Sequence, residues 1–358
     1  MHAIKTRLTQ LLNVTTPIVG APMGYPWSAD LACAVTEAGG FGMTGAAFDT
    51  PEKLRETLGD IRKKLNVPSG QALPIGVGLI GWVLDRTEMS EDPRIPAVLN
   101  ELPTAIWFAF GEDLGTYVRQ VRAYEAKRQH KTLVFVCVNS VEEALVAAND
   151  WKVDVIAAQG TFIQGMLVVH NSRILDTGVE AGGHGSSHAP TLSILVSAIL
   201  AALPNGPPIV AAGGIATGPQ VASLLTLGAS GVILGTRLLF TPECAYTPTQ
   251  KSLLLKADLN ATTRGMCFDE VNRTLGWPEG IDGRAIANGI WTDAQEGLDV
   301  EERILKYDEG KEKGEEERVL VWAGAAAGLT KEIKGAGEVV REIHDGALEA
   351  LRTAATLF

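Results

Sequence analysis

The sequence predicts an α/β protein: a closed (β/α)8 barrel of the TIM type, followed by a helical region over the barrel mouth. Short β-branched runs alternate with helix-like stretches, and eight such runs precede residue 240. The runs are apolar throughout, as expected of parallel strands buried on both faces. We therefore expect a barrel over residues 1–240 and a mainly helical substrate or lid region over residues 241–358. An open, doubly wound sheet is the alternative.

The expected strands cover residues 17–23, 41–47, 74–82, 105–111, 132–139, 153–160, 208–216 and 231–239. The amphipathic stretches between them predict helices over residues 29–39, 51–65, 93–102, 113–129, 140–150, 191–203 and 218–228. After the eighth strand, further helices are predicted over residues 250–258, 284–297 and 331–356. The mixed-charge run 299–318 predicts a solvated helix or loop.

Charge and composition narrow the choice of partners. The net charge of -11 disfavours nucleic acid and anionic membrane surfaces. The four cysteines are far apart and form no CxxC pair, so we expect neither a disulfide framework nor a metal site. No apolar run is long enough for a transmembrane helix. We expect a cytoplasmic protein; the acid-free start with Lys5 and Arg7 leaves a mitochondrial transit peptide as the alternative.

The active site of such a barrel lies at the C-terminal ends of its strands. At the first strand end, Ala21-Pro22-Met23 would let the backbone approach a flat ligand closely, although an ordinary tight turn is the alternative. Gly213-Gly214 and Gly235-Thr236 follow the seventh and eighth strands, where such barrels bind phosphate. Arg237 would add a positive charge there. The alternative is that these glycines serve packing alone.

His184 is the candidate for proton transfer. It stands in the run Glu180-Ala-Gly-Gly-His-Gly, and the flanking glycines leave the imidazole uncovered at the barrel mouth. Histidine is the side chain most readily tuned to exchange protons near neutral pH. The alternatives are a structural histidine, or His188 in the same role. The remaining histidines have no such setting.

Taken in order, these motifs resemble those of the nitronate monooxygenases. The shared motifs are APMG, a Gln-Gly pair, EAGGH, AAGGIATG and GTR, and they span roughly residues 4–245. The flavin-dependent enoyl-ACP reductases share the barrel and the AGGH motif. The resemblance implies bound FMN and a catalytic role for His184. It also implies ten cofactor-binding residues: Ala21, Pro22 and Met23 beside the isoalloxazine, Gln159, Gly182 and Gly183 around it, and Gly213, Gly214, Gly235 and Thr236 at the phosphate.

The chemistry implied by the resemblance is oxidation of a nitronate or nitroalkane by O2, giving a carbonyl compound and nitrite. One alternative is an NAD(P)H-dependent flavin reductase acting on enoyl thioesters, and another is a degenerate flavin-binding barrel without activity. A flavin-free sugar-phosphate lyase or isomerase would need a lysine or carboxylate at a strand end. Lys131 and Lys152 instead precede their strands.

Two departures from the family pattern stand out. Gly78 occupies a position at the third strand end where many members carry asparagine, so a polar contact to flavin or substrate is missing. In addition, residues 161–178 separate Gln159-Gly160 from Val179-Glu180, which the family joins directly. Because codons for the flanking residues can encode splice signals, we hypothesise that this segment is a translated, unspliced intron. A genuine loop that covers the substrate is the alternative.

Overall fold

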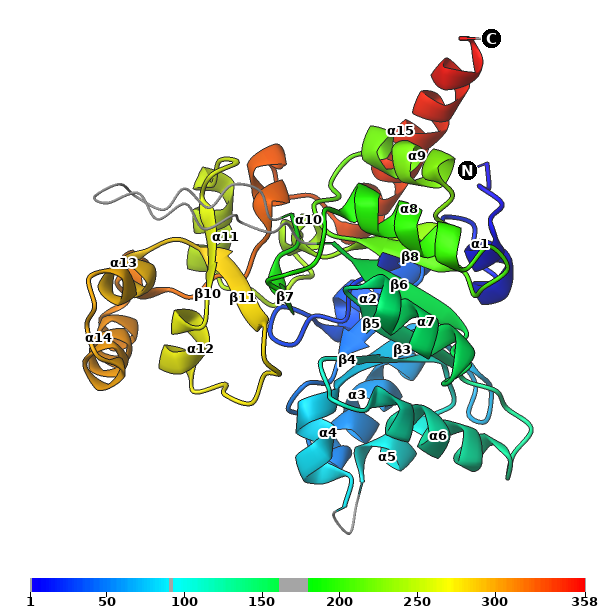
Figure 1. The fold of residues 1–358 in the computed structure, drawn as a ribbon, viewed down its shortest axis with the longest axis horizontal. Helices are drawn as coiled ribbons and strands as arrows, with labels where there is room; N and C mark the ends of the chain where they lie inside the picture. Colours follow the sequence, from blue (N-terminus) through cyan, green and yellow to red (C-terminus); the bar gives the residue numbers. More distant parts are fainter. Residues whose placement is uncertain (1, 90–92, 161–179, 358) are drawn as a thin grey trace.

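The computed structural model describes residues 2–89, 93–160 and 180–357, and its core is a barrel of parallel strands (Figure 1). The eight strands of this sheet are β1 (Ile18–Gly20), β2 (Met43–Gly45), β3 (Leu73–Ile80), β4 (Pro103–Ala109), β5 (Leu133–Val138), β6 (Val155–Gln159), β8 (Ile209–Ala212) and β9 (Gly231–Leu234). Their spatial order is β1-β9-β8-β6-β5-β4-β3-β2. The predicted barrel is therefore confirmed, and the open sheet is excluded.

The barrel closes between β1 and the chain just before β2. Val19 forms a parallel bridge with Phe41. The backbone N–H of Phe41 donates to the carbonyl of Ile18 at 2.9 Å, and the N–H of Gly20 donates to the carbonyl of Phe41 at 2.9 Å. These bonds pair the two strands at the ends of the sheet order, so neither end remains an open edge.

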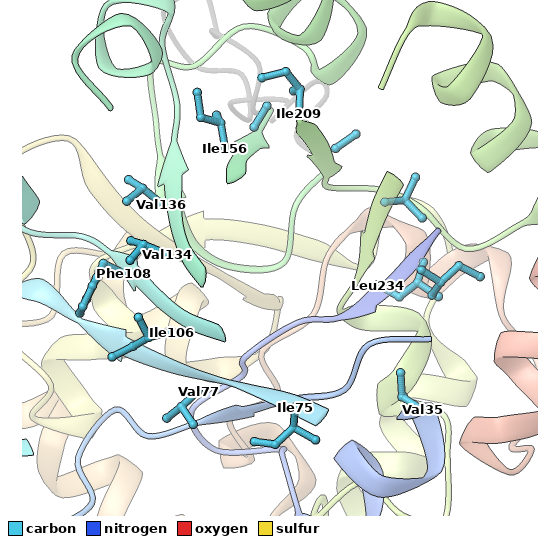
Figure 2. Packing of buried hydrophobic residues seen from close by; sticks show 14 of the residues in the cluster. Val35, Ile75, Val77, Ile106, Phe108, Val134, Val136, Ile156, Ile209 and Leu234 are labelled. Atoms are coloured by element: carbon cyan, nitrogen blue, oxygen red, sulfur yellow. The ribbon is translucent and has the colours of Figure 1, made fainter. Parts of the chain in front are cut away.

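Alternate side chains of each strand pack on opposite sides of the barrel wall. In β4, Ala105 and Trp107 belong to the inner cluster, whereas Ile106 and Phe108 pack against the surrounding helices. Figure 2 shows this outer layer, with side chains such as Val77 and Val136 directed away from the barrel centre. Both faces are apolar, which explains the continuous apolar runs in the sequence.

In the described ranges, ten helices lie between residue 1 and residue 240. They are α1 (Arg7–Leu12), α2 (Ala29–Glu37), α3 (Pro51–Lys64), α4 (Gly81–Thr87), α5 (Arg94–Asn100), α6 (Leu114–Glu125), α7 (Val141–Asn149), α8 (Leu192–Ala202), α9 (Gly218–Leu227) and α10 (Thr236–Leu239). Helix α1 contributes Leu8 and Leu12 to the inner cluster. The eighth predicted strand was too long, because residues 236–239 form helix α10 instead.

Local sequence signals set the bounds of these helices. Helix α3 begins after Thr50, whose hydroxyl accepts the N–H of Lys53, and Pro51 occupies its first turn. Three basic residues stand in its last turn, next to the negative end of the helix dipole. Helix α7 begins in the same way after Ser140, whose hydroxyl accepts the N–H of Glu143.

The remainder of the chain forms a region beside the strand ends (Figure 1). It contains the three-stranded antiparallel sheet β10-β11-β7, which the sequence did not predict. Its strands are β7 (Gly183–Ser186), β10 (Thr262–Gly265) and β11 (Ile281–Ile286), and its helices are α11 (Pro248–Lys256), α12 (Cys267–Asn272), α13 (Gly289–Gln295), α14 (Val300–Lys313) and the 3-10 turns η1 (Glu316–Arg318) and η2 (Ala325–Leu329). The mixed-charge run is thus mostly helical, as expected.

The last helix, α15 (Ala336–Ala355), packs against α9 and α2 and completes the outer helical layer of the barrel. The division at residue 240 stays a prediction. Among the helices of the described ranges, none combines the length and the apolarity needed to cross a membrane. The hypothesis about residues 161–178 falls on residues outside the described part of the chain.

Candidate active site

A single cavity lies at the C-terminal ends of the barrel strands. Its volume is about 1420 Å³, including space open to solvent. His184 and all ten residues predicted to bind the cofactor line it: Ala21, Pro22, Met23, Gln159, Gly182, Gly183, Gly213, Gly214, Gly235 and Thr236. The structure thus brings together motifs that are spread over more than two hundred residues of sequence, as expected for a barrel of this type.

His184 is held on strand β7, which pairs with β11 and places it opposite Gly283. Its side chain is only 14 % exposed. The Nε2 atom lies 2.9 Å from both carboxylate oxygens of Asp269, which is fully buried on α12. A buried carboxylate needs compensating donors, and His184 supplies one of them.

Asp269 receives two further hydrogen bonds. The hydroxyl of Thr274 donates at 2.7 Å and the indole Nε1 of Trp277 donates at 2.9 Å, both to Oδ1. Both groups use Asp269 as an acceptor, which is the only role open to a carboxylate oxygen without a proton. We therefore assign the imidazole hydrogen of His184 to Nε2, where it points at this acceptor. In the neutral imidazole the lone pair is then on Nδ1, which is the atom able to accept a proton.

Two tryptophans fix the imidazole plane. The ring of Trp277 stacks on His184 with centroids 3.5 Å apart and planes inclined by 10°. Trp322 lies at 4.7 Å and is tilted by 50°. Trp277 also donates to Oδ1 of Asp269, the same oxygen that lies 2.9 Å from Nε2 of His184. This shared oxygen fixes the indole and the imidazole relative to each other.

Gln159 connects the barrel wall to the histidine. The Nε2 of Gln159 donates to the backbone carbonyl of His184 at 2.9 Å. The backbone carbonyl of Gln159 accepts from Nδ2 of Asn139 at 2.8 Å. Gln159 therefore positions strand β7 from the end of β6. The amide group has a second N–H, so this bond leaves a donor for a ligand.

Backbone conformation shapes the predicted phosphate end. Gly213 and Gly214 have φ values of 123° and 68°, a region that residues with a Cβ rarely adopt. Gly235 and Thr236 stand at the start of α10, where the first N–H groups lack intrahelical acceptors. The Thr236 Oγ1 accepts the N–H of Gly324 at 2.9 Å, which leaves its hydroxyl hydrogen to donate. Arg237 does not add its charge here, because it lines a second cavity instead.

Gly78 is explained by the first strand end. A Cβ at this position would lie 2.3 Å from Cβ of Pro22 and 2.7 Å from its Cγ. Pro22 thus occupies the space that an asparagine side chain would need. This contact makes the cavity less polar than the family pattern implies.

Comparison with known proteins agrees with this geometry. The family model described as nitronate monooxygenase matches residues 5–346. The chain belongs to the nitronate monooxygenase family. Members of this family are flavin-dependent oxidoreductases.

Two relatives named nitronate monooxygenase are similar over nearly the whole chain. The one from Neurospora crassa is 29 % identical and covers 94 % of this chain and 90 % of its own length. Nitronate monooxygenase npaC of Metarhizium robertsii is 30 % identical, and the match covers 92 % of this chain and 90 % of that protein. Among solved structures, FabK from Thermotoga maritima superposes with a TM-score of 0.76 at 24 % identity. The match covers 99 % of this chain and 100 % of that chain, which shows the shared fold.

The structure also separates this family member's two candidate histidines. His188 is exposed and does not line the cavity. Its ring lies near Gly280. Of the two, only His184 lines the cavity.

Sequence analysis missed Asp269 and the residues around it. Asn272, Thr274 and Trp277 line the cavity, but they lie beyond residue 240 and outside the family motifs. Trp322, which also lines it, belongs to the short stretch Val321-Trp322-Ala323-Gly324 that resembles the family. One signal was present: Asp269 stands in a short helix among Cys267, Phe268 and Val271, all buried. An acidic residue inside such a turn must find donors elsewhere in the chain.

Proposed function

We propose that this protein uses FMN to oxidise nitronates or nitroalkanes with O2, releasing a carbonyl compound and nitrite. The observation that carries the proposal is the His184–Asp269 pair. It presents a histidine with a defined tautomer inside a cavity lined by the predicted cofactor residues. Family membership supports the flavin chemistry.

The cavity fits FMN at both ends. The open backbone at Gly213-Gly214 and the start of α10 suit the phosphate, and the apolar turn Ala21-Pro22-Met23 suits a flat ring. A Cβ added to Gly235 would have no atom within 3.5 Å, so the space there is free for a ligand. When bound, FMN supplies the electron transfer to O2 that the side chains cannot provide.

His184 supplies the proton chemistry. With Nε2–H held by Asp269, the Nδ1 lone pair takes the acidic proton from the carbon that bears the nitro group. The resulting imidazolium is stabilised by the Asp269 carboxylate and by the face of Trp277. A nitronate that arrives already ionised needs no base.

The second candidate is an NAD(P)H-dependent flavin reductase acting on enoyl thioesters. The fold match to FabK is the observation that supports this second candidate. No steady-state assay can confuse the two: oxidation of a nitronate consumes O2 and releases nitrite, whereas the reductase consumes NADPH. We expect nitrite release coupled to O2 consumption, without NADPH. Oxidation of NADPH that depends on an enoyl thioester, with no nitrite from nitronates, would overturn the proposal.

A further inference from the structure

We infer that the preferred substrates are nitronates and nitroalkanes with an uncharged, apolar substituent, either aryl or branched alkyl. This inference rests on the proposed function and names its substrate class. It follows from four of the aromatic side chains that line the cavity, which we call the aromatic wall: Phe48, Phe110, Trp277 and Trp322.

The aromatic wall is a connected packing arrangement. Phe110 meets Trp277 edge-on with centroids 5.5 Å apart, and Trp277 stacks on His184. The buried Trp82 lies behind the wall and contacts Trp277 at 5.5 Å and Phe48 at 5.8 Å. Such edge-to-face contacts hold rings in place. The apolar surface therefore begins at the catalytic histidine and extends outward along the cavity.

Backbone strain marks one member of the wall. Phe110 has φ of 59°, a left-handed conformation that is costly for a bulky side chain. Its backbone carbonyl accepts the N–H of Trp82 at 3.0 Å, which holds the end of β4 against the end of β3. A ring placed at such a cost beside the cavity indicates a ligand-binding role.

The charges around the cavity point the same way. Within the described part of the chain, no lysine, arginine, aspartate or glutamate lines it. Arg86 lies over the ring of Trp82, 5.0 Å from its centroid, and also does not line the cavity. A carboxylate on the substrate would lose its water there without gaining a cation. Pro22 against Gly78 removes a further polar position.

Two polar side chains line the cavity at the His184 end. They are Asn272 and Thr274, and Thr274 donates to Asp269. An ionised nitronate has its charge on the two nitro oxygens, so it suits this end, whereas its carbon substituent faces the aromatic wall. One polar end and one apolar wall match an amphiphilic substrate.

The first test compares steady-state turnover of three nitronates by the FMN-loaded full chain. They are the nitronates of phenylnitromethane, of 1-nitropropane and of 3-nitropropionate. The last of these carries an additional carboxylate. We expect kcat/KM for the carboxylated substrate to be lower than for the phenyl compound by about tenfold or more. Equal values, or a preference for the carboxylated nitronate, would overturn the inference while leaving the proposed function intact.

The second test changes the charge of the wall. Phe48 is 45 % exposed, so Phe48→Arg can be made without opening the core. We expect Phe48→Arg to reduce or reverse the preference in kcat/KM for the phenyl nitronate over the carboxylated one, because the arginine supplies the missing cation. Leu305→Arg is the matched control: Leu305 is 63 % exposed and lies outside the cavity. A ratio that moves equally in both variants would contradict a local effect.

The third test measures binding without turnover. Neither 2-methyl-2-nitropropane nor 4-methyl-4-nitropentanoate has a proton on the carbon bearing the nitro group, so neither can ionise there. Calorimetry on the FMN-loaded protein should show the neutral compound binding about tenfold or more tightly. This outcome supports the inference whether or not nitronates are turned over. A lack of nitronate turnover would contradict the proposed function and leave the inference standing. Tighter binding of the carboxylated compound would overturn the inference.

Discussion

Nε2 of His184 lies 2.9 Å from both carboxylate oxygens of Asp269, although 85 residues separate the two in sequence. The aspartate comes from the region beyond the barrel and the histidine from the strand that follows the sixth barrel strand. The geometry of the proposed proton-transfer pair therefore depends on how this outer region packs on the barrel.

Asp269→Asn should impair turnover of neutral nitroalkanes by about 100-fold or more, since loss of a correctly oriented base is typically worth about 10²–10⁴-fold. An asparagine amide can donate to Nε2, which would shift the imidazole hydrogen to Nδ1 and remove the base. The ¹⁵N chemical shifts of His184 report the tautomer directly.

Thr274→Val is the matched control for Asp269→Asn, because it removes one donor to Asp269 and leaves the carboxylate in place. We expect a smaller loss and an unchanged tautomer. If Asp269→Asn keeps hydrogen on Nε2 and retains turnover, Asp269 has no positioning role.

His184→Asn should leave FMN bound but slow neutral nitroalkanes by about 10²–10⁴-fold. Nitronates need no deprotonation, so their turnover should fall less. His188→Asn is the control, since His188 does not line the cavity. The selective loss appearing in His188→Asn, with His184→Asn unaffected, would show that the wrong histidine has been assigned.

Gly235→Ala tests the phosphate cradle. The added methyl would have its nearest neighbour, Cβ of Ala21, at 3.7 Å, and the φ of -106° at this position lies outside the left-handed region that favours glycine. The apoprotein should keep its melting temperature, while FMN affinity falls by about tenfold or more as the methyl enters the ligand space. Gly59→Ala, with open space around it, is the control. Undiminished flavin affinity in Gly235→Ala would refute the cradle.

Residues 161–178 provide a prediction about the gene as well as the protein. A Cβ on Gly213 would lie 3.2 Å from the carbonyl oxygen of Gly160 and 3.5 Å from the backbone nitrogen of Ala181. The chain on either side of the segment is therefore close enough to be joined by a short connection. We expect a Δ161–178 variant to fold and to bind FMN, and the mature transcript to lack these codons.

The intron hypothesis fails if the mature transcript contains all eighteen codons and the full-length protein binds FMN and turns over at least as well as the Δ161–178 variant. The segment would then belong to the enzyme, as the alternative holds. Sequencing the transcript and measuring flavin content of both proteins decides between the two.

The barrel was predictable because each βα unit has a local pattern. Residues 132–139, for example, form a continuous apolar run that must be buried on both faces, and they enclose strand β5. The position of Gly213-Gly214 and Gly235-Thr236 at the cavity was predictable for the same reason, because each motif directly follows a strand. Their role in binding phosphate stays a prediction. Neither inference needed knowledge of distant contacts.

The partners of His184 depended on such contacts. Asp269 and Trp277 are brought to the histidine by the pairing of β7 with β11, and strand β7 consists of Gly-His-Gly-Ser, which has no β-propensity. Tertiary pairing alone makes these residues a strand. The aromatic wall likewise gathers rings from four separate segments, and no local pattern announces it.

The most direct test of the central claim is the visible absorption spectrum of the full-length protein. The protein is incubated with FMN, freed of excess and kept anaerobic, and spectra are taken before and after a nitronate is added. We predict the spectrum of about one noncovalently bound FMN per chain, which is altered by the nitronate and restored by O2 with release of nitrite. A protein that retains no flavin, or whose bound flavin is unaffected by nitronates and is reduced by NADPH, would contradict the account.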